Sequence, residues 1–156
     1  MAPYKAMRIR DRINADIILA MKAQDPPRLS ALRMMKSAVK LKEVEAGAEL
    51  EDGQAIQVLS SMIKQRRDAI ELFGKGGRTD LVEKETAEIR VIEEYLPAAP
   101  TVDEIASVVD EVVRESGASS PRDLGPVMKQ CMARFSGRPV DGKRLNAAVR
   151  VRLGQT

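Results

Sequence analysis

The chain of 156 residues has no histidine and no tryptophan, and its only cysteine is Cys131. Without histidine, the commonest general base, the commonest metal ligand and every His-based triad are missing. A single cysteine excludes an intrachain disulfide and a cysteine-based zinc cluster, and on a helix it is expected to be a small buried side chain. Aromatic residues make up 3% of the chain, too few for the stacking platform of a single-stranded RNA binder. We therefore expect no metal and no other cofactor.

Long hydrophobic runs are also missing. The first ten residues hold too few consecutive apolar side chains for a signal peptide, and no segment approaches the length of a membrane span. One free thiol suits a reducing compartment. We therefore expect a cytoplasmic protein with no membrane partner.

Apolar residues at helical spacing are abundant. Ile9, Ile13 and Ile17 lie on one face of a helix, and similar stripes recur along the whole chain. Residues that start or stop helices fall between the stripes. In the first part of the chain these signals are Asp25–Pro27, Gly47, Asp52–Gly53, Gly74–Gly77 and Thr79–Asp80. They predict four helices.

A proline-containing segment separates this part from the rest of the chain. Leu96-Pro97-Ala98-Ala99-Pro100 cannot continue a helix, because proline lacks the N–H and clashes with the preceding turn. We therefore expect an N-terminal helical domain over residues 1–97 and a C-terminal domain over residues 101–156.

Three short helices are expected in the second domain. Thr101 and Glu104 fit a capping box, and Ser120 and Asp141 fit the N-caps of the two helices that follow. Pro126 predicts a kink or a tight first turn in the middle helix. The predicted fold class is all-α, with a four-helix segment followed by a small three-helix bundle.

Positive charge is concentrated at the end of the chain. From Ser116 onward there are eight lysines and arginines and two acidic residues, a net charge of +6, whereas the whole chain carries +3. A compact module this basic indicates an anionic partner, and the backbone of tRNA is the first candidate. A solvated basic face is the alternative interpretation.

Two glycine-bearing turns in this tail present cations around a helix N-terminus. That terminus offers free N–H groups and the positive end of the helix dipole, while arginine grips a phosphate at two points. The predicted RNA-binding residues are Arg122, Lys129, Arg138, Lys143 and Arg144.

A second group of cations lies in the first domain. The outer face of the third helix is basic, and the glycine-rich loop Gly74–Arg78 would let backbone amides approach an anion. The loop lacks the Gly-Lys-Ser/Thr of a Walker motif, and a simple interhelical turn is the alternative. Secondary RNA-contact candidates are Lys64, Arg66, Arg67, Lys75 and Arg78.

Two patterns resemble catalytic motifs without supporting catalysis. Ser37–Lys40 and Ser61–Lys64 have the Ser-x-x-Lys spacing of some serine hydrolases, but the other elements of that machinery are absent. Glutamates cluster on the fourth helix, where a solvated helix face paired with nearby bases is the simpler interpretation. We assign no catalytic residue.

With these segments in view, the chain resembles the GatB/YqeY family. The matching segments keep the family's order and span nearly the full length. They are Leu29–Glu43, Ile63–Glu71, Gly77–Leu81, Lys84–Ile89, Glu94–Pro97, Gly117–Gly125, Val127–Lys129 and Asp141–Lys143 with Asn146.

The resemblance implies a free-standing protein similar to the helical and tail domains of the B subunit of tRNA-dependent amidotransferases. In that subunit the tail domain touches tRNA, and by family association the activity would be that of a carbon–nitrogen ligase with glutamine as amido-N-donor. The catalytic cradle of that subunit has no counterpart among the matching segments. The resemblance therefore implies tRNA recognition, with an aminoacyl-tRNA synthetase or amidotransferase subunits as further candidate partners.

Three hypotheses follow. The first is a tRNA-binding module without catalysis of its own, and the second is a subunit of an amide-transferring enzyme. The third is a protein-interaction adaptor that uses the acidic fourth helix and the basic tail.

Overall fold

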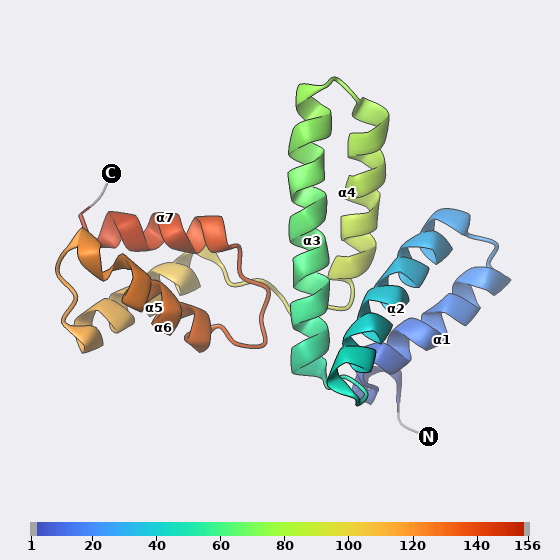
Figure 1. Ribbon diagram of the computed structural model, residues 1–156, viewed down its shortest axis with the longest axis horizontal. Helices are drawn as coiled ribbons and strands as arrows, with labels where there is room; N and C mark the ends of the chain where they lie inside the picture. Colours follow the sequence, from blue (N-terminus) through green and yellow to red (C-terminus); the bar gives the residue numbers. More distant parts are fainter. Residues whose placement is uncertain (1–2, 155–156) are drawn as a thin grey trace. The chain divides into compact units, whose positions relative to one another are not determined.

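A computed structural model describes residues 3–154 and is all-helical over that range, with no β-strand (Figure 1). The chain divides into two compact units between Leu96 and Pro97, and each unit is described by itself. The first contains η1 (Tyr4–Ala6), α1 (Ile9–Lys22), α2 (Pro26–Ala46), α3 (Asp52–Lys75) and α4 (Thr79–Glu93). The second contains α5 (Val102–Ser116), η2 (Pro121–Asp123), α6 (Leu124–Arg134) and α7 (Gly142–Arg152).

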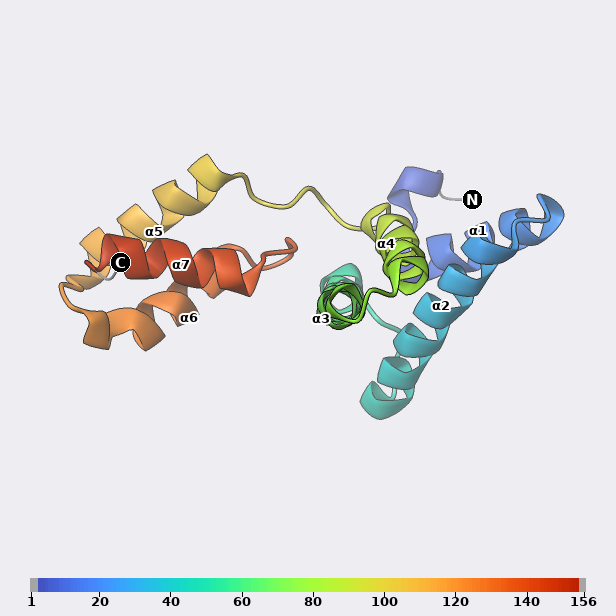
Figure 2. The ribbon, with the colours of Figure 1, turned by 90° about the horizontal axis from the view of Figure 1, so that it is seen from above.

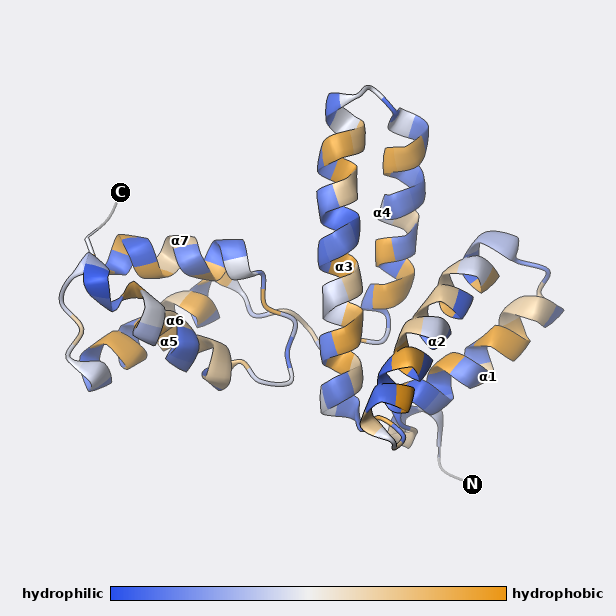
Figure 3. Ribbon diagram, viewed as in Figure 1, coloured by the Kyte–Doolittle hydropathy of each residue, from blue (hydrophilic) through white to orange (hydrophobic). Residues whose placement is uncertain are grey.

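Two antiparallel helix hairpins build the first unit. Helix α1 lies along α2 and α3 lies along α4, while α2 also packs against α4 and α3 (Figures 1 and 2). Apolar and hydrophilic residues alternate along α3 and α4, which lets each helix turn one stripe inward (Figure 3). The fully buried side chains of this unit include Ile13, Leu32, Met35, Leu50, Leu59 and Ile92.

Local capping explains where these helices begin and end. The Asp25 carboxylate accepts the Arg28 N–H at 3.2 Å at the start of α2, and Gly47 ends that helix with φ +69°. A side chain at Gly47 would strain this left-handed conformation, which glycine adopts freely. The helix limits expected at the two prolines and at Gly47 are thus confirmed.

Polar side chains also lie inside the first unit. Asp16 is 6% exposed and accepts hydrogen bonds from the hydroxyls of both tyrosines, Tyr4 and Tyr95. The Arg12 guanidinium carbon lies 5.5 Å from the Tyr4 ring centroid and 5.2 Å from that of Tyr95. Glu43, which is also buried, accepts from Arg10 Nε at 2.6 Å and from the Leu50 N–H at 2.8 Å. Both buried carboxylates, Asp16 and Glu43, thus have hydrogen-bond partners, as burial of charge requires.

The second unit is a three-helix bundle. The Thr101 hydroxyl accepts the Glu104 N–H at 3.1 Å, and the Glu104 carboxylate accepts the Thr101 N–H at 2.8 Å, which confirms the expected capping box. Cys131 is fully buried, as expected, and burial raises the pKa of its thiol. The bundle core includes Val109, Val112, Val127, Cys131, Leu145 and Val149.

Pro126 lies in the first turn of α6, directly after the 3-10 helix η2. The missing N–H of a first-turn proline would have no intrahelical partner in any case, so the helix tolerates it there. This confirms the tight first turn. Helix α6 ends at Arg134, three residues before Gly137, which has φ +84°.

Candidate functional site

The basic tail is not an isolated block of charge, because α5 brings carboxylates to it. Arg134 forms ion pairs with Glu111, at 3.3 Å, and with Glu115. Arg152 Nε lies 3.1 Å from an oxygen of Asp110. Over residues 97–156 there are nine basic and seven acidic residues, so the net charge of this unit is far smaller than that of the tail alone.

Arg138, one of the predicted RNA-binding residues, is held by the start of the same unit. Its Nη2 lies 3.0 Å from Glu104, and its Nε donates to the Ala98 carbonyl at 3.3 Å. The Thr101 N–H and the Arg138 guanidinium together lower the pKa of the Glu104 carboxyl. Arg138 therefore stabilises the junction between the linker and α5. A phosphate would have to compete with Glu104 to bind the Arg138 guanidinium.

Lys143 and Arg144 are the two predicted residues that the structure brings together at a helix N-terminus. Both side chains are exposed in the first turn of α7, whose N-cap Asp141 accepts the Lys143 N–H at 3.0 Å. Arg144 Nε lies 3.9 Å from Asp141, the limit for an ion pair. Helix α7 itself has four cations and no acid, so the helix dipole and the side chains both make its first turn electrostatically positive.

Arg122 and Lys129 lie on η2 and α6, away from the first turn of α7 in sequence. Both are exposed, and within residues 3–154 no carboxylate lies within 4 Å of either cation. The structure thus leaves four of the five predicted residues open to an anion, in two separate segments.

Of the secondary RNA-contact candidates on α3, Arg66 is buried, whereas Lys64 and Arg67 are exposed. Arg66 was expected on the outer face, and this is wrong: it is 7% exposed, and its Nε donates to Glu88 at 3.0 Å. Its Nη2 also approaches the Met34 sulfur at 3.6 Å. The helical period explains the error, because Arg66 falls on the same stripe as Leu59 and Ile63 while carrying a charge. Lys64 and Arg67 are exposed as expected.

The glycine-rich loop between α3 and α4 is an interhelical turn. Gly77 has φ +70°, and the Arg78 N–H donates to the Phe73 carbonyl at 2.9 Å. Lys75 lies 3.5 Å from Glu71, and Arg78 lies 3.1 Å from Asp80, so nearby acids partly satisfy both candidate cations.

The patterns that resemble catalytic motifs gain no partner in the structure. Within the described residues no hydrogen bond joins Ser37 to Lys40 or Ser61 to Lys64. On α4, Glu88 and Glu85 face Arg66 at 3.0 and 3.8 Å. Over residues 3–154, no group of three or more acidic, histidine or cysteine side chains is placed to hold a metal ion, and no helix is long and apolar enough to cross a membrane.

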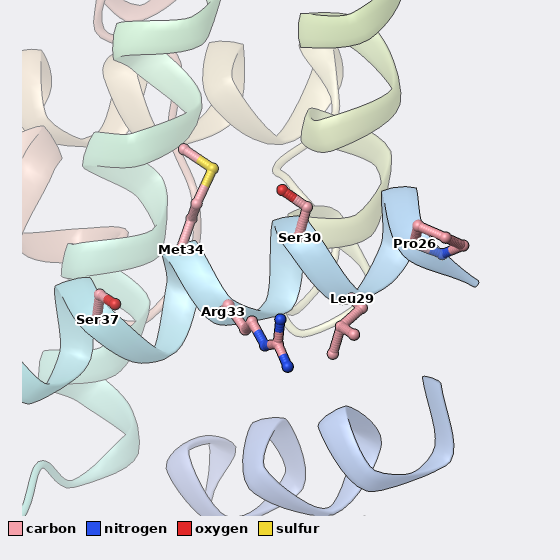
Figure 4. Close-up of a pocket in the computed structure, with 6 residues that line it drawn as sticks. All are labelled: Pro26, Leu29, Ser30, Arg33, Met34 and Ser37. Atoms are coloured by element: carbon pink, nitrogen blue, oxygen red, sulfur yellow. The ribbon is translucent and has the colours of Figure 1, made fainter. Parts of the chain in front are cut away.

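One surface was missed in the sequence. Two open hollows lie along α2, of about 560 and 370 Å³. Figure 4 shows the first, with Ser30 and Met34 directed toward α3 and α4, and Leu29 and Arg33 directed toward α1. The sequence does contain a signal for this surface, which is the helical spacing of Arg33, Lys36 and Lys40. That spacing overlaps the pair Ser37 and Lys40, which resembles a catalytic motif.

Comparison with known proteins agrees with the resemblance. The protein family described as Yqey-like protein matches residues 10–153. A protein of Lachancea thermotolerans named Altered inheritance of mitochondria protein 41, mitochondrial, is 37% identical over 112 residues, 70% of this chain. A protein of the same name from Pyrenophora tritici-repentis is 30% identical over 146 residues, 92% of this chain and 80% of its own length. The matched region covers 60% of the Lachancea protein.

Proposed function

The chain belongs to the Yqey-like protein family, and from this premise we propose that it binds the phosphate backbone of a folded RNA of the tRNA type. The observation that carries the proposal is the first turn of α7, where Lys143 and Arg144 stand exposed on a helix without acids. Other tail cations, such as Arg134 and Arg152, are tied to α5. The proposed contact is therefore focused on one helix end.

Recognition would be by shape and phosphate position. The chain has two tyrosines, two phenylalanines and no tryptophan, and Tyr95 is buried. Few aromatic side chains are therefore available to stack on bases. Phosphate contacts by lysine and arginine position an RNA without reading its sequence. Arg122 and Lys129 would add contacts from η2 and α6.

A gel shift with folded tRNA tests the proposal. The double variant Lys143→Ala/Arg144→Ala should bind more weakly and with a shallower dependence of log Kd on log salt, because each lost phosphate contact removes about 0.9 from the slope. The matched control is Lys84→Ala/Arg90→Ala on α4, which removes the same charge from exposed positions. Equal affinity of both variants and of the unchanged chain would rule out α7 as the site.

Amide transfer remains the alternative that the family association raises, as part of a complex in which glutamine is the amide donor. Its test is incubation of the pure chain with glutamine, ATP and misacylated tRNA. Amide product formed without added subunits would replace the binding proposal. The adaptor alternative is tested by co-purification, where a protein partner and a low ratio of absorbance at 260 to 280 nm would favour it over RNA binding.

The proposed compartment is the cytoplasm. The names of the fungal relatives place those proteins in mitochondria, which makes mitochondria the alternative for this chain. Fractionation of the source cells, followed by detection with an antibody to the chain, separates the two.

A further inference from the structure

The first three quarters of α2 are as one-sided in charge as the tail. From Pro26 to Lys42 there are five cations and no acid. Two of these are paired: Arg28 with Glu94 at 2.8 Å and Lys42 with Glu45 at 3.0 Å. The other three, Arg33, Lys36 and Lys40, are exposed, and within residues 3–154 no carboxylate lies within 4 Å of them.

These three cations share one face of the helix. Their spacings of three and four residues place them within one stripe, with rises of about 4.5 and 6 Å along the axis. Ser30 and Ser37 lie on the same stripe and add two hydroxyl donors. We call the set of Ser30, Arg33, Lys36, Ser37 and Lys40 the α2 cationic face.

The face runs along the two hollows. Ser30, Arg33 and Ser37 line the first, of about 560 Å³. Lys36 and Lys40 line the second, of about 370 Å³, together with Asn14 of α1. The Asn14 Oδ1 is buried from solvent and has no hydrogen-bond partner. The same amide carries an N–H₂ group, which can donate to an anionic ligand.

The second hollow has a net positive lining. Glu43 is its one acid, and Arg10 holds that carboxylate at 2.6 Å. The Arg10 hydrogen bond is the main cause that lowers the pKa of Glu43, and the charge of Lys40 contributes. With Glu43 balanced by Arg10, the two lysines remain uncompensated, and their charges favour an anion.

The shape of the surface decides between kinds of anion. Small-molecule sites enclose most of their ligand, whereas the first hollow is mostly open to solvent and the second is partly open. A membrane surface would call for a protruding apolar stripe with interfacial aromatics, and this face is hollowed and has none. A polymer that offers a phosphate at each turn of the helix suits both the open shape and the spacing of the cations.

We propose that the α2 cationic face is a second phosphate-binding surface, which holds the same RNA that α7 contacts. The inference rests on the proposed function and extends it to two-point binding. When one RNA engages both surfaces, the second contact is intramolecular, so the two together bind more tightly than either alone.

The test uses the full chain and folded tRNA, with Kd measured by fluorescence anisotropy at several salt concentrations. The triple variant Arg33→Gln/Lys36→Gln/Lys40→Gln keeps good helix formers on α2. Its slope of log Kd against log salt is expected to be shallower by about two to three than that of the unchanged chain. The matched control, Lys22→Gln/Lys84→Gln/Arg90→Gln, removes the same charge from exposed positions outside the face and should leave the slope within about one.

Each outcome is decisive. Equal slopes for the two triple variants overturn the inference, and if Lys143→Ala/Arg144→Ala still weakens binding in the same assay, the proposed function stands alone. If the unchanged chain ignores tRNA at low salt, both fail. A triple variant that keeps its RNA slope but loses binding to vesicles of anionic phospholipid would assign the face to a membrane and overturn the inference.

Discussion

The Nε of Arg66 lies 3.0 Å from an Oε of Glu88, and both side chains are buried between α3 and α4. Breaking such a pair strands a charge out of water, which costs more than the pair itself contributes. We therefore expect Arg66→Ala to lower the free energy of unfolding by about 3–5 kcal/mol, measured by urea denaturation followed by circular dichroism.

The double variant Arg66→Met/Glu88→Leu should recover most of that loss, because two apolar side chains of similar volume leave no charge buried. Lys64→Ala is the matched control on the exposed side of the same helix, and it should change stability by less than about 0.5 kcal/mol. A small effect of Arg66→Ala, comparable with that control, would contradict the buried pair.

Helix limits were predictable from the sequence because they depend on neighbours along the chain. Thr101 with Glu104 formed the capping box expected from their spacing, and Asp141 capped α7. The pairing of charges was not predictable in the same way. Arg66 forms an ion pair with Glu88 across a hairpin, and Arg152 forms one with Asp110 across the bundle. The partners are far apart in the sequence, so no local pattern predicts either pair. A net charge counted along the tail therefore overstated what an anion would meet.

Tyr95 gives a prediction at alkaline pH. Burial first, and then its hydrogen bond to Asp16, raise the pKa of the Tyr95 hydroxyl well above its ordinary value. The unfolded chain releases this proton near pH 10, while the folded chain still holds it. The stabilising contribution of this group should therefore be constant below pH 10, and stability should fall as the pH rises above it.

The Tyr95→Phe variant isolates the effect. At pH 7 it should be less stable by about 1–2 kcal/mol, because the buried Asp16 loses one of its two hydroxyl donors. Its stability should then decline less steeply than that of the unchanged chain between pH 9 and pH 11, as followed by urea denaturation. Tyr4→Phe is the comparison, with a smaller loss at pH 7 because Tyr4 is 47% exposed. Parallel pH profiles for the unchanged chain and Tyr95→Phe would refute the assignment.

The α5 carboxylates are expected to restrain RNA binding. Glu111→Gln/Glu115→Gln would release Arg134 from both of its ion pairs. These pairs are exposed, so the loss of stability should be at most about 1 kcal/mol. Affinity for folded tRNA should rise, and the salt slope should steepen by about one as Arg134 becomes available to a phosphate. Glu83→Gln/Glu93→Gln on α4 makes the same charge change elsewhere, and an equal gain from that control would show that only net charge matters.

Asp141 links the cap of α7 to the proposed site, and two substitutions separate its roles. Asparagine caps a helix about as well as aspartate, so Asp141→Asn should keep the thermal stability of the chain. It also removes the negative charge 3.9 Å from Arg144. Kd for tRNA should then fall about threefold to fivefold, since the charge lost is worth about 1 kcal/mol at this distance in water.

Asp141→Ala removes both the charge and the cap that holds the Lys143 N–H, and should cost about 1 kcal/mol of stability. Tighter binding by Asp141→Ala than by Asp141→Asn would mean that an ordered first turn of α7 is unnecessary for binding, contrary to the proposed site, whereas tighter binding by Asp141→Asn alone would place the phosphate at that turn.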